Sequence, residues 1–408
     1  MAHERPARLI ELPRAPEAIE LRHLRAFVAV AEELNFSRAA ERLFLSQPAL
    51  SRQISSLERL LRVQVLRRNT QRVELTLAGE ALLSRSRSML ADLDDAVVTT
   101  RSIGGEVDER VTQLTRPLAE AANDLDEFRA ANEALNAQFP VPAEIGMRPV
   151  TAGGVPSLVF GRDGGAGRPT VLLAHGGGYV VGSAYGTRPL AGALAAAAGA
   201  SVLVPDYRLA PEHRYPAAVD DALAAYRWLL ERADSPADVA LVGESSGGGL
   251  AMSVLLRLKA AGEPLPGRVV LLCPWVDLAC RYLRDDTVHP EQDGIAQLAR
   301  INAERYLDGH PPGDPLLDPL GVDLSGLPAM LVQVATGDFV LHESRLLVER
   351  ARAAGVDARL ALYPVATHVF HIYWSFLPEA ALALEQAGAF IVGAAEPDSA
   401  AETYERPA

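Results

Sequence analysis

The sequence is poor in the features that mark secreted and membrane proteins. Its 408 residues include only two cysteines, Cys273 and Cys280, which excludes a disulfide framework and fits a reducing compartment. The longest apolar run, residues 190–204, is rich in Ala and Gly and too short to span a bilayer. Residues 1–20 are broken by prolines and acidic residues and lack the apolar centre of a signal peptide. We therefore predict a cytoplasmic protein that does not contact membranes.

Positive charge is scarce overall but concentrated in one region. The net charge of −13 argues against a protein that coats nucleic acid along its whole length. Residues 35–90, however, hold ten arginines and four glutamates, a net charge of +6, which leaves −19 for the remainder. A chain of this length, with 49% hydrophobic residues, can form a large domain and a smaller one. This asymmetry predicts an anion-binding module joined to an acidic domain.

A serine at a sharp strand-to-helix turn carries the clearest chemical signal. An apolar run at 239–242 stops at Gly243, Ser245 follows, and a helical pattern starts after Gly247. In this context Gly-x-Ser-x-Gly predicts a nucleophile elbow, in which glycines avoid a clash where the strand reverses into a helix. Taken alone, the motif is equally compatible with a glycine-rich turn that has no chemical role.

A second glycine-rich loop follows an earlier strand pattern. Residues 170–174 are apolar and lead into the sequence His175-Gly-Gly-Gly-Tyr179. A loop bare of side chains can direct several backbone N–H groups at one point, where an ester carbonyl becomes a negative oxygen under attack. Each such donor is worth about 3 to 4 kcal/mol. The expected oxyanion-hole donors are Gly177, Gly178 and Ser246.

A serine nucleophile needs a base, and the base needs an orienting carboxylate. Asp338 and His368 each follow a strand pattern, and the chain order Ser, Asp, His is that of α/β-hydrolases. We therefore predict a catalytic triad of Ser245, His368 and Asp338. The alternatives are His371 as the base and Glu343 as the acid, but both lie where the following helices are expected to begin.

Five motifs extend this pattern. They are His175–Gly178, Asp206–Glu212, Gly243–Gly248, Pro274–Asp277 and Asp314–Leu320. Together they make residues 143–392 resemble the hormone-sensitive-lipase-like branch of the α/β-hydrolases. The resemblance implies a carboxylesterase for short to medium acyl esters, with the same triad and a helical cap partly built before the first strand. We expect no cofactor and no metal. Two departures stand out, since Glu244 and Ser246 flank the serine where Asp and Ala are usual, and Phe339 follows the acid where Pro is common.

Within this region strand patterns begin near residues 170, 201, 239, 269, 330 and 359 and alternate with helices. This alternation predicts a mostly parallel sheet covered on both faces. We interpret Tyr207, Asp277 and Asp314 as structural residues. Residues 280–310 have no sheet pattern and are expected to complete the cap.

The N-terminal region predicts three helices. Apolar residues recur at helical spacing from Leu21, Ser37 is expected to cap a second helix over 38–43, and Ser46 a third over 47–61. Two helices joined by a tight turn form a helix-turn-helix, whose second helix enters the major groove of DNA. The polar side of this helix is expected to present Gln47, Ser51, Arg52 and Ser55. A basic ribbon at 67–72 looks like a wing that follows the DNA backbone.

Six motifs, Leu24–Phe27, Ser37–Ala40, Leu43, Ser46–Ser51, Leu57-Glu58 and Leu75–Gly79, carry a second resemblance. With them residues 19–100 resemble the N-terminal domain of LysR-type transcriptional regulators. The resemblance implies binding of double-stranded DNA, and the implied contact residues are Gln47, Pro48, Ser51 and Arg52, with Arg68 and Arg72 on the wing. Arg62 replaces the usual Gly of the turn, and Leu66 replaces the usual Phe of the wing.

Residues 78–100 continue as a helix with a seam of Leu83, Ser86, Leu90, Leu93 and Val97. Such a seam suits pairing with a second copy, and the resemblance implies a homodimer through this linker helix. The glycine-rich junction at 103–106 is where LysR-type proteins enter their effector domain. Here a polar helical stretch over 107–138 and the hydrolase follow instead, so we interpret residues 107–143 as cap and spacer.

The predicted fold class is α/β, in this order: tail 1–18, winged helix-turn-helix 19–78, linker helix 79–104, cap and spacer 105–145, α/β-hydrolase 146–395, tail 396–408. We favour a bifunctional protein, a DNA-binding regulator whose second domain is a working esterase. The alternative is a pure transcription factor whose hydrolase fold only binds an effector. An esterase that uses its helix-turn-helix only to dimerise is the third hypothesis.

Overall fold

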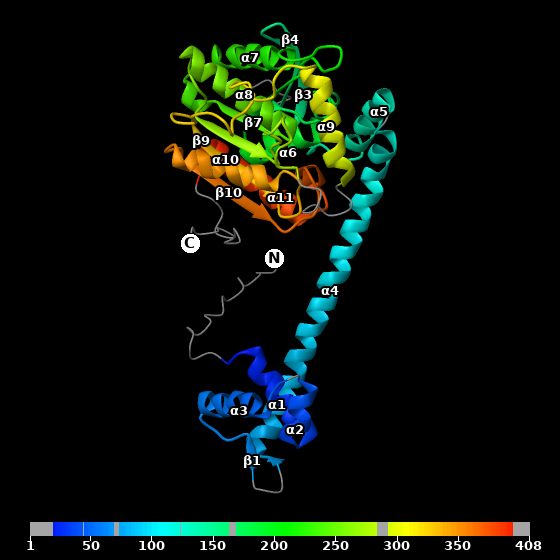
Figure 1. Cartoon of the computed structure of the whole chain (residues 1–408), viewed down its shortest axis with the longest axis vertical. Helices are drawn as coiled ribbons and strands as arrows, with labels where there is room; N and C mark the ends of the chain where they lie inside the picture. Colours follow the sequence, from blue (N-terminus) through cyan, green and yellow to red (C-terminus); the bar gives the residue numbers. More distant parts are fainter. Residues whose placement is uncertain are drawn as a thin grey trace, which may run out of the picture. The chain divides into compact units, whose positions relative to one another are not determined.

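The computed structural model describes residues 19–43, 45–68, 73–122, 124–162, 169–283 and 293–394. The chain divides into two compact units, Met1–Glu106 and Val107–Ala408. Helix α4 (Leu77–Ala121) begins in the first unit and ends in the second (Figure 1). The boundary between the units therefore falls inside a helix rather than in a loop.

The first unit is organised around three short helices. These are α1 (Leu21–Glu33), α2 (Phe36–Arg42) and α3 (Gln47–Leu61). Their apolar faces meet in a common core, in which Phe27, Val30, Leu50, Ile54 and Leu57 have no exposed surface. Helices α2 and α3 pack against α1 and against each other. This confirms the predicted helix-turn-helix.

The helix caps of this unit are only partly as predicted. Ser46 caps α3 as expected, since its side chain accepts a hydrogen bond from Ala49 N at 3.4 Å. The prediction that Ser37 caps α2 is wrong. Helix α2 starts two residues earlier than expected, at Phe36, so Ser37 lies inside it. Asn35 Oδ1 instead accepts from the backbone N–H groups of residues 37 and 38, at 2.9 and 3.1 Å.

The turn after α3 contains the predicted strained residue. Arg62 has φ 55° and ψ 27°, the left-handed conformation that costs a residue with a Cβ about 1–2 kcal/mol. The wing follows as two antiparallel strands, β1 (Leu66–Arg68) and β2 (Val73–Leu75). Glu58 Oε1 accepts from Leu66 N at 3.2 Å and ties the wing to α3. Arg72 and the side chain of Arg68 lie outside the described residues.

Helix α4 runs without a break through the expected glycine-rich junction at 103–106. The boundary between the two units does fall at this position, after Glu106, but the helix is not interrupted there. A helical glycine costs only about 1 kcal/mol relative to alanine. The two glycines at 104 and 105 therefore destabilise this 45-residue helix without interrupting it. Residues 88–108 have helical backbone, but their side chains lie outside the described set.

Part of the predicted dimer seam on α4 contacts the unit's own core. Leu83 packs against the cluster formed by α1 and α3, and Ser86 is 1% exposed. Arg87 also bonds to Glu32 of α1 at 2.8 and 3.0 Å. Ser86 is therefore covered, and Leu83 partly covered, by the same chain. The side chains of Leu90, Leu93 and Val97 lie outside the described residues.

The second unit is built on an eight-stranded sheet with strand order β10-β9-β8-β7-β5-β6-β4-β3. The six predicted strands form its parallel part. They are β5 (Pro169–Ala174), β6 (Ser201–Pro205), β7 (Ala240–Glu244), β8 (Arg268–Leu272), β9 (Ala329–Ala335) and β10 (Ala358–Tyr363). Strands β5 and β7 are neighbours although they lie far apart in sequence, which brings the loops that follow them to the same edge.

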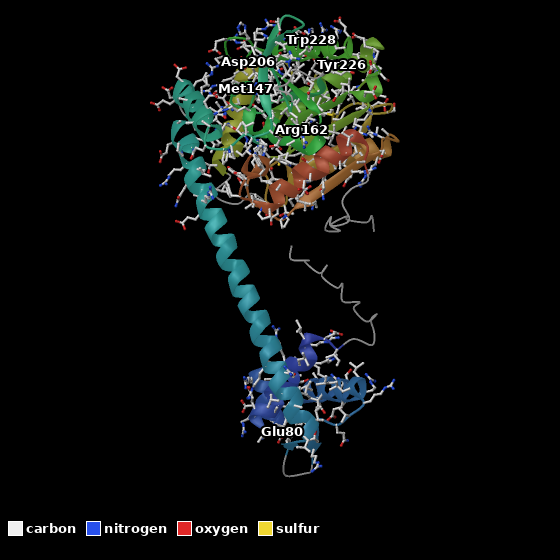
Figure 2. The ribbon with its side chains drawn as sticks, turned by 180° about the vertical axis from the view of Figure 1, so that it is seen from behind. Glu80, Met147, Arg162, Asp206, Tyr226 and Trp228 are labelled. Carbon is white, nitrogen blue, oxygen red and sulfur yellow. The ribbon has the colours of Figure 1, made fainter. Side chains whose placement is uncertain are left out.

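Two strands at one end of the sheet were not predicted. Strands β3 (Gly146–Ala152) and β4 (Val155–Gly161) form an antiparallel hairpin that joins the sheet through β6. Their signal is the Gly-Gly pair at 153–154, a typical two-residue hairpin turn between two strands of equal length. Met147 on the edge strand β3 is 47% exposed (Figure 2).

Helices cover both faces of the sheet, as predicted. One face packs against α6 (Arg188–Ala198) and α11 (Pro378–Val392). The other packs against α7 (Ala217–Leu230), α8 (Ser246–Ala261) and α10 (Leu341–Ala353). Neighbouring residues of one strand point to opposite faces, so the central strands β5 to β9 are apolar on both sides. Short turns of 3-10 helix lie at η1 (Pro236–Asp238) and η3 (Phe370–Tyr373).

Two further helices lie outside these layers. They are α5 (Leu125–Asn136) and α9 (Asp293–Leu307), the latter within the segment expected to complete the cap. Both line the cavity described below, together with the end of α4. Among the described residues, no helix is long and apolar enough to cross a membrane.

Candidate active site

Ser245 occupies the turn between β7 and α8. Its backbone has φ 53° and ψ −121°, a strained conformation for a residue with a side chain. The flanking glycines permit this turn, because a Cβ on Gly243 would lie 2.3 Å from Gly247 O, and one on Gly247 would lie 2.1 Å from Ala174 O. The strand therefore reverses into the helix within one residue, which is the geometry of a nucleophile elbow.

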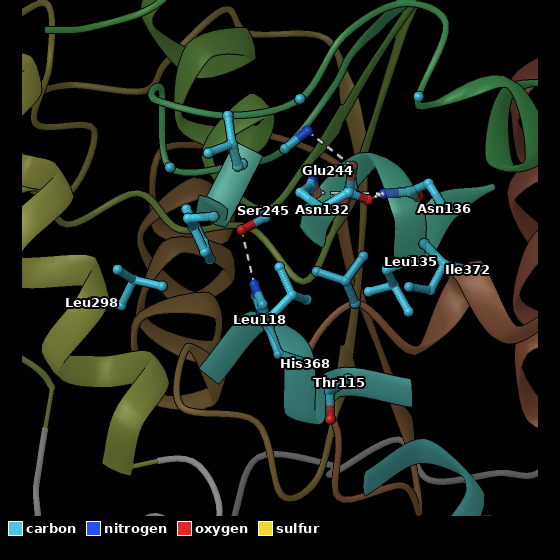
Figure 3. Close-up of a pocket in the computed structure, with 18 of the residues that line it drawn as sticks. Thr115, Leu118, Asn132, Leu135, Asn136, Glu244, Ser245, Leu298, His368 and Ile372 are labelled. Carbon is cyan, nitrogen blue, oxygen red and sulfur yellow. Dashed lines mark hydrogen bonds between the residues drawn. The ribbon is translucent and has the colours of Figure 1, made fainter. Parts of the chain in front are cut away.

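His368 and Asp338 form a hydrogen-bonded series with this serine. Ser245 Oγ lies 2.8 Å from His368 Nε2 (Figure 3). His368 Nδ1 lies 2.9 Å from both carboxylate oxygens of Asp338. The Asp338 side chain is fully buried, and its Oδ1 also accepts from Val340 N at 3.2 Å. The acid is thus held in place by the loop after β9, and the histidine by the loop after β10.

The two rival residues are placed elsewhere. His371 is fully buried, and its Nε2 lies 3.2 Å from Gln333 Oε1. Burial lowers the pKa of His371 to about 3. Glu343 lies in the first turn of α10 and accepts from Val276 N at 2.6 Å, and burial raises its pKa well above the usual value. In the part of the chain that the structure describes, neither residue has a hydrogen bond to Ser245 or His368.

The loop after β5 brings free backbone donors to the nucleophile. Gly177 and Gly178 have φ 111° and 61°, and a Cβ on Gly177 would lie 2.1 Å from Val181 O. Within the described part of the chain, no hydrogen bond uses the N–H of Gly177, Gly178 or Ser246. Both glycines line the same cavity as Ser245. The structure therefore brings the expected oxyanion turn to the nucleophile.

Glu244 has a contact that the sequence reasoning missed. Its Oε2 accepts from Gly176 N at 2.8 Å, so the residue before the nucleophile anchors the residue before the oxyanion glycines (Figure 3). Burial raises the pKa of this carboxyl, although the Gly176 N–H and His368 oppose the shift. The only sequence signal was that Glu replaces the usual Asp. That signal gave no partner, because Gly176 lies 68 residues away.

Tyr207 supports the residue that precedes the glycine-rich turn. Tyr207 OH donates to His175 O at 2.8 Å, and the two rings stack at 4.1 Å between centroids. This matches the structural role expected for Tyr207. Asp277 accepts from Arg281 N and Tyr282 N, and Asp314 pairs with His310, so both aspartates stabilise loops.

A cavity of about 320 Å³ opens in front of Ser245. Its wall is partly apolar, with Leu118 from α4, Leu135 from α5 and Leu298 from α9 (Figure 3). Among the described lining residues there is no lysine or arginine, and Glu244 is the one carboxylate. The cavity therefore suits a small uncharged ligand.

One cluster in the described residues could ligate a metal. Cys273, Asp338 and His368 have donor atoms within 4.8 Å of one another. His368 Nδ1 already bonds to Asp338. Burial, together with the nearby Asp338, raises the pKa of the Cys273 thiol. His368 and Asp338 use these atoms in the hydrogen-bonded series with Ser245, so we assign no metal to this cluster.

The candidate DNA-contacting residues lie on α3. Gln47, Pro48 and Arg52 are exposed, whereas Ser51 is half-buried. Leu50 and Leu57 point into the core on the opposite side of the helix. The structure therefore brings four of the six predicted residues onto one helix. Arg72 and the side chain of Arg68 lie outside the described residues.

Comparisons with known proteins agree with both halves of this description. Residues 171–372 match the family model described as alpha/beta hydrolase fold, and residues 21–80 match that of the bacterial regulatory helix-turn-helix proteins of the lysR family. An acetyl-hydrolase of Streptomyces hygroscopicus is 44% identical over 224 residues, which are 54% of this chain and 75% of that protein. An esterase of Acinetobacter venetianus is 34% identical over 257 residues, 62% of this chain and 84% of that protein.

Among solved structures, an esterase from the bacterial hormone-sensitive lipase family is similar with a TM-score of 0.63 and 36% identity. The match covers 69% of this chain and 96% of that one. The fold and the strained serine turn define an α/β hydrolase of the serine type. The chain belongs to the α/β-hydrolase family, in its hormone-sensitive-lipase-like branch, and carries an N-terminal helix-turn-helix domain of the LysR family.

Proposed function

We propose that this protein is a serine carboxylesterase for short to medium acyl esters, fused to a DNA-binding regulatory module. The observation that carries the proposal is the hydrogen-bonded series of Ser245, His368 and Asp338 beside unpaired N–H groups. The named activities of the relatives, which are esterases and acetyl-hydrolases, support the enzyme class. The cavity volume is near the lower end of the range for ligand pockets, about 300–1,000 Å³, which favours small esters.

The mechanism follows from the geometry. Asp338 holds the N–H on Nδ1 of His368, so Nε2 is free to take the proton of Ser245 Oγ as this oxygen attacks the ester carbonyl carbon. Gly177, Gly178 and Ser246 donate to the resulting oxyanion. Collapse of this intermediate breaks the ester bond, and His368 passes its proton to the departing alcohol. Water then attacks the acyl-enzyme, with its proton taken by His368, and releases the acid and Ser245.

The proposal assigns DNA reading to residues 19–78. Gln47, Pro48, Ser51 and Arg52 would contact bases and nearby phosphates, since three of them are exposed on α3. The wing arginines, Arg68 and Arg72, would contact the backbone. The protein would act as a homodimer through α4, using the later seam positions, because two half-sites require two reading helices.

A DNA-binding protein with two free cysteines fits the cytoplasm. We assign 79–104 to the linker, 105–145 to cap and spacer, and 146–395 to the hydrolase domain.

The experiment is hydrolysis of p-nitrophenyl esters with acyl chains of two to twelve carbons, by wild type and by Ser245→Ala. We expect turnover that is greatest for the shorter chains and is lost in the variant. DNA binding, measured by a mobility shift on a cognate site selected from random duplexes, should persist in Ser245→Ala. Arg52→Ala serves as the converse control, with weakened DNA binding and an unchanged esterase rate.

Absence of turnover for every chain length by a folded wild-type protein would contradict the proposal. The hydrolase domain would then be the ligand sensor of a transcription factor. Equal DNA binding by wild type and Arg52→Ala would remove Arg52 from the reading residues.

A further inference from the structure

Helix α9 places one amide side chain in the wall of the cavity, between apolar neighbours. Asn302 is only 3% exposed, yet it lines the cavity together with Leu298 and Ala299. Its Oδ1 accepts from Arg305 Nη1 over a long 3.5 Å contact. Within the described residues, its Nδ2 has no acceptor. Because Asn302 lines the cavity, this donor is free for an acceptor that arrives with the ligand.

The same nitrogen lies against the oxyanion turn. A Cβ built on Gly178 would lie 2.5 Å from Asn302 Nδ2 and 3.2 Å from Asn302 Cβ and Cγ. The amide group thus packs directly on the backbone whose N–H is proposed to hold the carbonyl oxygen. An acceptor bound by this amide would lie close to the reacting carbonyl.

The geometry of the reaction indicates which part of the ester carries that acceptor. The leaving oxygen must face His368 Nε2, because that nitrogen protonates it. The carbonyl oxygen faces the oxyanion turn, and Ser245 Oγ takes a third direction. The acyl chain takes the fourth direction. The three backbone N–H groups satisfy the carbonyl oxygen, and within the described residues no hydrogen bond joins Asn302 to the imidazole. We therefore assign its acceptor to the acyl chain.

The charges of the cavity limit the acceptor further. No lysine or arginine is among the described lining residues, and the Glu244 carboxylate would repel an anion. The acceptor is therefore an uncharged oxygen, such as an ether or a hydroxyl.

We propose that Asn302 is a specificity-determining residue, whose Nδ2 donates a hydrogen bond to an oxygen on the acyl chain. The enzyme would thereby prefer esters of short oxygen-substituted acids to those of plain alkyl acids. This inference rests on the proposed esterase function, and it extends that function to a class of substrate.

The test uses two esters of the same shape. In p-nitrophenyl methoxyacetate an ether oxygen replaces the third carbon of p-nitrophenyl butyrate, with the same leaving group. The ratio of kcat/KM for the two esters is measured in wild type, Asn302→Leu and Asn302→Ser, so that the intrinsic reactivity difference cancels between proteins. Leucine preserves the shape of asparagine, and serine keeps a polar group that is too short to reach the same acceptor.

We expect the methoxyacetate-to-butyrate ratio to fall about 3- to 10-fold in both variants, the effect of one uncharged hydrogen bond. Leu298→Ala is the matched control on the same helix, and it should change both rates by a similar factor. Thermal melting checks that each variant is folded.

An unchanged ratio in folded variants would overturn the proposal. So would a change limited to the alcohol side, measured with butyl acetate against 2-methoxyethyl acetate. If wild type hydrolysed none of these esters, the proposed esterase function itself would fail, which is a distinct result.

Discussion

The hydrogen bond between Glu244 and Gly176 yields the sharpest prediction about catalysis. Gly176 precedes the two oxyanion glycines, and its N–H donates to Glu244 Oε2 at 2.8 Å. Glu244→Ala would remove this anchor and leave the Gly176 N–H without an acceptor. A hydrogen bond to a charged group contributes about 1.5–3 kcal/mol. If the whole of that loss appears in the transition state, kcat falls about 10- to 150-fold.

The upper limit on this loss comes from the oxyanion hole. Removal of one donor of such a hole typically lowers kcat by about 10²–10³-fold, and Glu244→Ala only loosens the donors without deleting them. We therefore expect a loss of about 10- to 100-fold in kcat with KM nearly unchanged. Glu244→Gln keeps an acceptor of the same length and should retain most of the activity.

The assay is steady-state hydrolysis of p-nitrophenyl butyrate, with thermal melting as a check on folding. An unchanged kcat in folded Glu244→Ala would refute the reasoning. A rise in KM alone would instead assign Glu244 to ground-state binding. Equal losses in Glu244→Gln and Glu244→Ala would show that the negative charge matters and the acceptor does not.

Three further predictions concern stability and the cap. Because the pKa of His371 is lowered to about 3, the folded state keeps this residue neutral, and stability should fall by up to about 1.4 kcal/mol per pH unit as the pH drops from about 6.5 towards 3. His371→Gln should lack this slope in pH-dependent thermal melting, and parallel curves would contradict the assignment. Asn35→Ala should destabilise the first unit by about 1 kcal/mol in urea unfolding, while Ser37→Ala has little effect; the reverse order would restore Ser37 as the cap. Arg129 ties α5 to the hydrolase through Val180 O, Ala210 O and both carboxylate oxygens of Glu212. Arg129→Ala should therefore raise KM several-fold with a smaller change in kcat, and Arg129→Lys should recover little, since lysine lacks the planar fork; full recovery by lysine would show that charge alone suffices.

The local patterns of the sequence predicted secondary-structure elements better than they predicted contacts between residues far apart in the chain. The turn at Ser245 was foreseeable because its glycines, its strand and its helix are all contiguous. The hairpin of β3 and β4 was not predicted, because its signal appears only when the glycine pair is considered together with the strand patterns on both sides. The sequence did not predict that α4 is continuous, because two adjacent glycines suggest a break. The helical residues on both sides of the glycines sustain the helix.

The residues that were missed at the site are those whose role depends on distant contacts. Glu244 meets Gly176 only because β5 and β7 are neighbours in the sheet. Asn302 meets Gly178 only because α9 folds over the oxyanion turn. No spacing in the sequence predicts either contact. The proposed triad could be predicted because its three residues follow strands whose order in such sheets is a general rule.

The position of the unit boundary inside α4 bears on how the two halves could ever be separated. A cut at residue 106 would expose four N–H groups and four C=O groups that the intact helix pairs internally. A cut after α4 would avoid this, but it would leave Thr115 and Leu118, which line the cavity, on the DNA-binding fragment. Any cut therefore either interrupts α4 or removes part of the cavity wall from the hydrolase. A gene fusion or a domain exchange has to keep α4 with both units.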